Sequence, residues 1–136
     1  MNWTLEVIVV PVTDIDRAKK FYADRLGFAV DHDTQAGDRR IVQLTPPGSG
    51  CSVVLGQGLS DMAPGSLSGV QLVVNDLVRA RAELVERGVE VGEIEVAGME
   101  GFRAHRDGDD LNNVGFLRFA DPDGNAWVVQ QITARP

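Results

Sequence analysis

The sequence predicts an α+β protein made of two tandem β-α-β-β-β modules, and three observations lead to this fold class. Segments with apolar residues at every second position alternate with segments whose apolar residues recur every three to four positions, as in strands and amphipathic helices. The segment VTDIDRA at 12–18 returns as VNDLVRA at 74–80, in register across a helix cap and a helix face. The length of 136 residues, 43% of them hydrophobic, suits a single domain over 1–136.

The first module is expected over about residues 1–60. Its β-branched segment LEVIVVPV predicts a strand, and Asp14 then stands where the N-cap of a helix would. The helix is expected over 15–26, with an apolar stripe on one face and Gly27 as its C-terminal cap. Three further strands are predicted, separated by turn-rich stretches, over 28–33, 39–45 and 51–58.

The second module, over about 66–136, repeats this order. A strand over 69–74 precedes a second N-cap, Asp76, and a helix over 77–87 that ends at Gly88. The later strands are predicted over 89–96, 115–120 and 127–131. The segment 97–115 is an insertion between the second and third strands of this module, and a structureless loop of this length is commonly a lid, a binding loop or disordered.

Charge and cysteine usage narrow the partners and the compartment. The net charge of -7 comes without a block of lysines or arginines, so we expect neither nucleic acid nor a membrane surface as a partner. The N-terminal apolar run has no basic leader or small-residue cleavage site. The single Cys51 cannot form an internal disulfide, has no base nominated beside it, and is interpreted as a buried small residue. These features predict a cytoplasmic protein.

The motif VTDIDRAKKFYADRLGF at 12–28, its degenerate copy and the closing FADPDGN at 119–125 resemble the vicinal oxygen chelate superfamily. This superfamily includes glyoxalase I, extradiol dioxygenases, and fosfomycin-resistance and bleomycin-resistance proteins. The resemblance implies that the sheets of the two modules curl together into a cup, often inside a homodimer. Whether the two halves of the cup pair within one chain or across a dimer stays open.

In metal-dependent members of the superfamily, four strands supply the ligands of a divalent ion. Carried over by position, the first-strand ligands become Val7 and Gly69, and the last-strand ligands become Val128 and either Ser52 or Val53. Imidazole and carboxylate groups hold such ions, whereas these side chains offer at most a hydroxyl. The resemblance therefore implies no metal and no cofactor here.

Alternative metal ligands are few in the sequence. They would have to come from the two histidines, from the acidic run that is interpreted as a solvated loop, or from strand amides: His32, His105, Asp107, Asp109, Asp110, Gln71 and Gln131.

Side chains in phase with the lost ligands should line the cup, because side chains alternate along a strand. In GFLRFA we choose the phase of Phe116 and Arg118 over that of Leu117 and Phe119, and we assign Trp127 to the core beneath the helix. The predicted ligand-binding residues are Val7, Val9, Gln43, Ser52, Gly69, Gln71, Arg118, Val128 and Gln130. Such an apolar wall with a few amides suits a flat or aromatic small molecule.

Three functions are compatible with these residues. The leading hypothesis is a metal-independent protein that sequesters a small, mostly apolar or aromatic molecule, as bleomycin-resistance proteins do. The second is a metal-free isomerase, cyclase, hydrolase or lyase that uses His105 or a loop carboxylate, since His105 could move protons near neutral pH. The third is an enzyme with unorthodox metal ligands.

Overall fold

The computed structural model describes residues 1–134, which divide into two compact units. Unit 1 comprises Met1–Leu67 together with Asp121–Asn125, and unit 2 comprises Ser68–Ala120 and the segment from Ala126 onward. The turn DPDGN is therefore part of unit 1, although it joins two strands of unit 2. In the part of the chain that the structure describes, no helix is long and apolar enough to cross a membrane.

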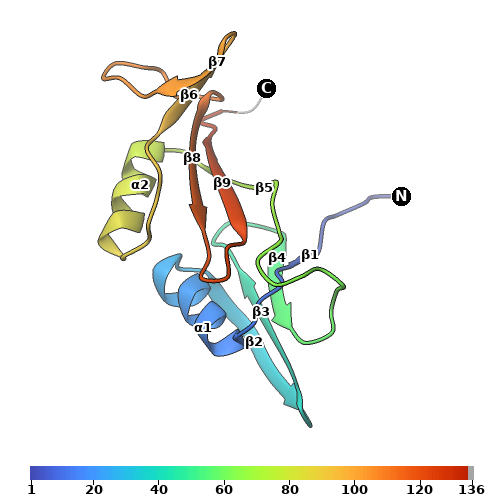
Figure 1. Ribbon diagram of the computed structural model, residues 1–136. Helices are drawn as coiled ribbons and strands as arrows, with labels where there is room; N and C mark the ends of the chain where they lie inside the picture. The colour runs from blue at the N-terminus through green and yellow to red at the C-terminus, as the bar shows by residue number, and fades with distance from the viewer. Residues whose placement is uncertain (135–136) are drawn as a thin grey trace. The chain divides into compact units, whose positions relative to one another are not determined.

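Unit 1 contains one four-stranded sheet with a helix against one side (Figure 1). The strand order is β1-β4-β3-β2, and β1 runs parallel to β4 while the other neighbours are antiparallel. The elements are β1 (Val7–Val9), α1 (Ile15–Lys20), β2 (Ala29–Ala36), β3 (Arg39–Thr45) and β4 (Ser52–Gly56).

The helix of unit 1 starts at the predicted Ile15 and ends at Arg25, one residue before the predicted end, but its winding changes along its length. The side chain of Asp14 accepts a hydrogen bond from the backbone of Arg17 at 3.0 Å, and Gly27 adopts the left-handed φ of 77° after the last turn. From Phe21 to Arg25 the chain is π-helical. This wider turn places Phe21 and Tyr22 side by side in the core, with their rings edge to face at 5.2 Å.

The core of unit 1 lies between its sheet and α1. Along β3, Val42 and Leu44 are fully buried, and Leu55 of β4 is fully buried beside them. The residues between them on the strands face the other side of the sheet, as the period of two predicts. β2 is longer than the predicted 28–33 and all of its residues are exposed, because it is an edge strand with polar side chains.

Unit 2 repeats the plan of unit 1 with one more strand. Its sheet has the order β5-β9-β8-β6-β7, with β5 parallel to β9 as β1 is to β4. The elements are β5 (Val70–Val74), α2 (Leu77–Glu86), β6 (Glu95–Gly98), β7 (Gly101–Ala104), β8 (Gly115–Ala120) and β9 (Ala126–Gln131). The predicted α+β class and the duplicated unit are confirmed.

The ends of α2 and the core beneath it also follow the sequence. The side chain of Asp76 accepts from the backbone of Arg79 at 3.0 Å, and Gly88 follows the helix with a φ of 81°. Trp127 is 1% exposed and its ring stacks on that of Phe119. The assignment of Trp127 to the core is thus confirmed.

Two predictions about unit 2 are wrong. The insertion 97–115 is not structureless, because its first part forms the β6–β7 hairpin, with Ala97 opposite Phe102. The strand predicted over 89–96 begins only at Glu95, and before it Val91 makes a single bridge. The apolar pattern there reflects burial without strand pairing, since Val89 is buried outside the sheet.

Candidate ligand-binding surfaces

The turn Asp121–Asn125 is built to hold unit 1 together. The side chain of Asn125 is fully buried and donates to the carbonyl of Pro11 at 2.9 Å and to Asp121 at 2.8 Å. Its side-chain oxygen accepts from the backbone of Leu67 at 3.0 Å, and Tyr22 donates to Asp121 at 2.7 Å. The side chains of Asp121 and Asn125 are therefore committed to structural hydrogen bonds and are not free to contact a ligand.

Asp123 of the same turn is nearly buried and carries a charge. Its Oδ1 accepts from the hydroxyl of Thr13 at 2.7 Å and from the backbone of Thr13 at 3.1 Å, and it lies 3.2 Å from Arg17. Burial by itself would raise the pKa of Asp123, but the hydrogen bonds from Thr13 and Arg17 outweigh it and lower the pKa. The carboxylate thus stays ionised and ties the turn to the start of α1.

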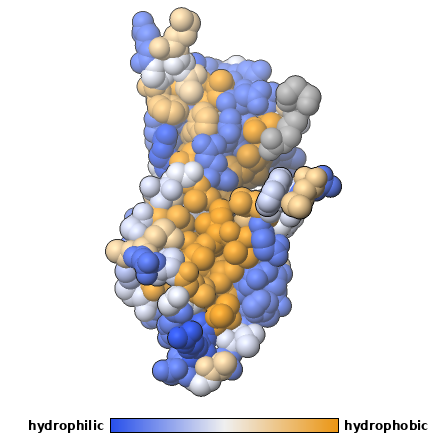
Figure 2. Space-filling view, turned by 90° about the vertical axis from the view of Figure 1, so that its right-hand side faces the viewer, coloured by the Kyte–Doolittle hydropathy of each residue, from blue (hydrophilic) through white to orange (hydrophobic). Residues whose placement is uncertain are grey.

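The sheet of unit 1 has one open side, away from α1. Strand register puts Val7 directly opposite Ser52, and Val54 opposite both Val9 and Gln43, so the four predicted residues of this unit share that side. We call this surface the unit-1 face; its residues are Val7, Val9, Ile41, Gln43, Thr45, Ser52 and Val54. Figure 2 shows a broad hydrophobic patch over it.

The positions that hold a metal in the superfamily do not fit one here. Of the carried-over residues, Val7 and Val128 have no donor atom, and Gly69 has no side chain. Ser52 is 7% exposed, and its hydroxyl lies 2.6 Å from that of Thr45. Among residues 1–134, no group of three or more His, Cys, Asp or Glu side chains is arranged to hold a metal ion. This donor set does not support a divalent ion.

The sheet of unit 2 also has one open side, with amides on β5 and β9. Register aligns Gln71, Val128 and Arg118 in one row across three strands, and Gln130 lies in the next row. Arg118 therefore lies on this side, as the chosen phase requires. Gln71 donates to Gln130 at 3.2 Å, and Gln130 donates to the backbone carbonyl of Asn113 at 2.9 Å.

The hairpin adds an aromatic and charged group to this side of the sheet. The ring of Phe102 is edge to face with that of Phe116 at 5.7 Å, and the guanidinium of Arg118 lies 4.9 Å from the centre of the Phe102 ring. Glu95 lies 3.3 Å from Arg118. We call the whole surface the unit-2 face; its residues are Gln71, Val73, Glu95, Phe102, Phe116, Arg118, Val128 and Gln130.

The sequence did not indicate Glu95 as part of this surface, because only the pairing of β6 with β8 brings it beside Arg118. Gly69 precedes β5 with a φ of 82°, and a Cβ there would meet nothing within 4 Å. It lies in phase with Gln71 but contributes backbone alone.

His105 lies on the opposite side of this sheet. Its backbone pairs with the carbonyl of Ile94 at 3.0 Å, one residue out of phase with Glu95, so it points with the buried Ile94 toward α2. There it lines a cavity of about 330 Å³ with Val78 and Arg81 of that helix. The structure thus separates the candidate catalytic histidine from Gln71 and Gln130.

Asp109 orders the rest of the insertion. Arg103 donates two hydrogen bonds to it, each of 2.9 Å, and the backbone of Arg106 donates a third at 2.7 Å. The side-chain bonds from Arg103, and then the backbone bond, hold the pKa of Asp109 well below its usual range. This carboxylate is a structural anchor of the loop.

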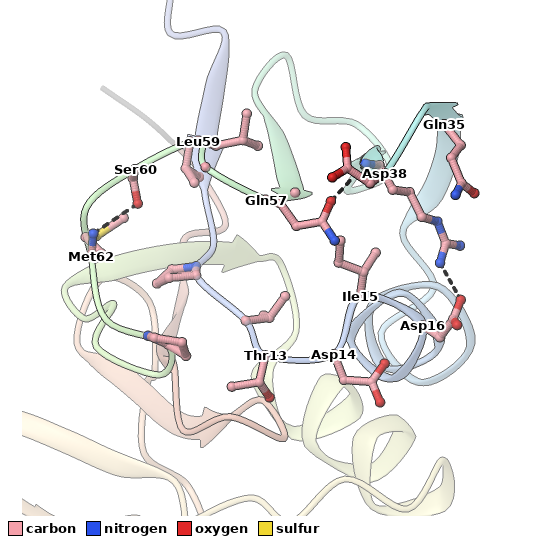
Figure 3. Close-up of a pocket in the computed structure, with 17 residues that line it drawn as sticks. Thr13, Asp14, Ile15, Asp16, Gln35, Asp38, Gln57, Leu59, Ser60 and Met62 are labelled. Atoms are coloured by element: carbon pink, nitrogen blue, oxygen red, sulfur yellow. Dashed lines mark hydrogen bonds and ion pairs between the residues drawn. The ribbon is translucent and has the colours of Figure 1, made fainter.

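A larger cavity, of about 750 Å³, opens in unit 1 beyond the carboxyl ends of β1 and β4 (Figure 3). Val9, Ile15 and Leu59 give it apolar walls. Two of its charged groups form a pair: Arg40 donates to Asp16, and the backbone of Arg40 donates to the side chain of Gln57 at 3.1 Å. Val9 alone of the predicted ligand-binding residues lines this cavity.

Comparison with known proteins agrees with the fold. Residues 4–129 match the family model of the Glyoxalase/Bleomycin resistance protein/Dioxygenase superfamily. The structure is similar to TnmS3, an antibiotic binding protein from Streptomyces sp. CB03234 (30% identity, TM-score 0.75, 96% of this chain and 97% of that chain).

Two further solved structures are similar over nearly their whole lengths. One is a glyoxalase/bleomycin resistance protein from the same Streptomyces strain (31% identity, TM-score 0.72, 94% of this chain and 100% of that chain). The other is a superfamily member from Sphaerobacter thermophilus DSM 20745 (27% identity, TM-score 0.75, 96% and 98%). A comparison with curated proteins finds no match. The chain belongs to the Glyoxalase/Bleomycin resistance protein/Dioxygenase superfamily.

Proposed function

We propose that this protein binds a small, mostly apolar or aromatic molecule without a metal ion, and holds it by sequestration. The carrying observation is that each sheet leaves one side open, where apolar residues surround a few amides and hydroxyls. The similarity to TnmS3, an antibiotic binding protein, supports the same reading. In this proposal each of the two faces, taken by itself, is a surface that can contact the ligand, and the protein acts in the cytoplasm.

The polar groups of the two faces favour binding over chemistry. Gln43, Gln71 and Gln130 donate and accept hydrogen bonds but do not transfer protons near neutral pH, which general acid–base catalysis requires. Glu95, the carboxylate of the unit-2 face, is paired with Arg118 at 3.3 Å. His105 points away from the amides of its sheet. An apolar surface with a small number of fixed polar groups is typical of a small-molecule site.

Ligand capture tests this proposal directly. Native mass spectrometry of the purified protein should first report any co-purified molecule, and a thermal-shift panel of aromatic antibiotics should then yield a ligand for calorimetry. We expect stoichiometric binding that is unchanged by EDTA, and recovery of the ligand with its mass unaltered. Turnover of the ligand, or loss of binding with EDTA, would contradict the proposal.

A pair of variants places the ligand. Val128→Glu adds a bulky negative charge to the unit-2 face and should weaken binding at least tenfold, about 1.4 kcal/mol. Val85→Glu makes the same change on the exposed side of α2, where the valine is 51% exposed, and should leave affinity unchanged. Equal affinities for both variants would show that the ligand does not bind to the unit-2 face.

A further inference from the structure

One cluster of the unit-2 face combines an exposed aromatic ring with a cation. Phe102 stands on β7 and Phe116 and Arg118 on β8, and the hairpin register brings them together. Phe102 is 51% exposed, although its ring touches both Phe116 and the guanidinium of Arg118. An open aromatic ring beside a fixed guanidinium is a surface on which another planar group can stack.

Most N–H donors of the Arg118 side chain make no hydrogen bond within residues 1–134 and are available to a ligand. Its side chain is 45% exposed, and within residues 1–134 it donates one side-chain hydrogen bond, from Nη1 to Glu95 at 3.3 Å. Glu95 is itself 41% exposed, and half-exposed single contacts of this kind contribute little stability. A guanidinium has five N–H donors in a planar fork, which matches carboxylate, sulfonate or phosphate oxygens.

Apart from Glu95, the side chains around the cluster on this face are uncharged. Gln71 and Gln130 are hydrogen-bonded to each other, and Val73 and Val128 are apolar. The other arginine of the hairpin, Arg103, lies in the opposite phase and is held by Asp109. In a protein of net charge -7, Arg118 is thus the group on this face that can attract an anion.

We infer that the unit-2 face selects aromatic ligands that carry an anionic group. The ring of the ligand lies against Phe102 and Phe116, and the anion pairs with Arg118, which Phe102 holds in place. This inference rests on the proposed function, and it adds the chemical class of the ligand. A neutral aromatic molecule binds the same face more weakly, because the guanidinium then gains no partner.

Two fluorescent probes of nearly the same shape test the charge preference. 8-Anilinonaphthalene-1-sulfonate is anionic, and N-phenyl-1-naphthylamine is its neutral counterpart. We expect the native protein to bind both saturably, with the sulfonate tighter by about tenfold, as one charge-assisted hydrogen bond provides. Arg118→Leu should abolish this preference by weakening the sulfonate alone, and Phe102→Ala should weaken both probes.

Matched variants separate charge from damage to the fold. Arg79→Leu removes an arginine that is 78% exposed on α2 and should leave both affinities unchanged. Arg118→Lys keeps the charge without the planar fork and should restore part of the sulfonate affinity. Glu95→Gln removes the competing carboxylate and should tighten sulfonate binding severalfold, which tests the cluster even if Arg118→Leu fails to fold.

The outcomes distinguish this inference from the proposed function. Equal affinities of the native protein for the two probes, or equal weakening of both by Arg118→Leu, overturn the charge preference while leaving aromatic binding intact. Failure of the native protein to bind either probe saturably overturns both proposals.

Discussion

Asn125 shows how a single residue can position strands that are far apart in the sequence. Its amide contacts Pro11 in the segment after β1, Leu67 in the linker and Asp121 in its own turn, over separations of up to 114 residues. A buried polar group of this kind is stabilising only while every partner is in place, because each orphaned group keeps its desolvation cost. The turn motif therefore holds three segments of unit 1 together.

Asn125→Ala tests this role. We expect the free energy of unfolding to fall by about 3 kcal/mol, since the carbonyl of Pro11 and the amide of Leu67 lose their partner in a buried site. Urea denaturation at neutral pH measures the change. Asn75→Ala removes an exposed asparagine and should change stability by less than about 0.5 kcal/mol. A similarly small effect for Asn125→Ala would show that these hydrogen bonds do not hold unit 1 together.

At the scale of elements, the hairpin β6–β7 is the feature that gives the unit-2 face its character. It brings Phe102 to the sheet, and its turn depends on Gly101, whose φ of 102° is rarely adopted by residues with a side chain. A Cβ at Gly101 would meet nothing within 4 Å, so any cost of a substitution arises from the backbone alone. The position of Phe102 therefore depends on the conformational freedom of one glycine.

Gly101→Ala should destabilise this hairpin locally by about 1–3 kcal/mol. We expect faster amide hydrogen exchange across 95–104 and weaker binding of aromatic probes, with little change in the exchange of β8 and β9. The control is Gly98→Ala in the same turn, where φ is not positive and a Cβ makes only an ordinary contact at 3.7 Å. Identical exchange for the two variants would argue against strain at Gly101.

At the scale of the whole molecule, the open sheet faces pose the question of what covers them. The unit-1 face is apolar, with Val7 and Ile41 both more than a third exposed. Contiguous apolar patches on soluble domains usually mark an interaction site. We propose that two chains form a homodimer that covers part of this surface.

Size-exclusion chromatography with light scattering measures the oligomeric state. We expect a mass of twice the 14.7 kDa chain at micromolar concentration, and a shift toward the monomer for Ile41→Asp on the unit-1 face. Val78→Asp places the same charge on an exposed position of α2 and should leave the dimer intact. A monomeric native protein at these concentrations would refute the dimer.

The sequence by itself determined the order of elements and their duplication. Strand and helix periods, the caps Asp14 and Asp76 and the glycines after each helix are local signals, because hydrogen bonds and burial within an element repeat along the chain. The alternation of side chains along a strand also predicted that Val7 and Ile8 lie on opposite sides of their sheet, and likewise Trp127 and Val128. Fold class and much of each candidate face were therefore open to prediction.

Tertiary structure alone decided which side chains lie on the open side of the sheet in the second module. The side on which Arg118 or His105 lies depends on pairing register, and a slip of one residue turns every side chain of a strand over. The β6–β7 hairpin was hidden because each of its strands has four residues and β7 is exposed throughout, so no apolar period marks it. The turn Asp121–Asn125 falls in unit 1 through hydrogen bonds to distant segments, and such contacts leave no local pattern in the sequence.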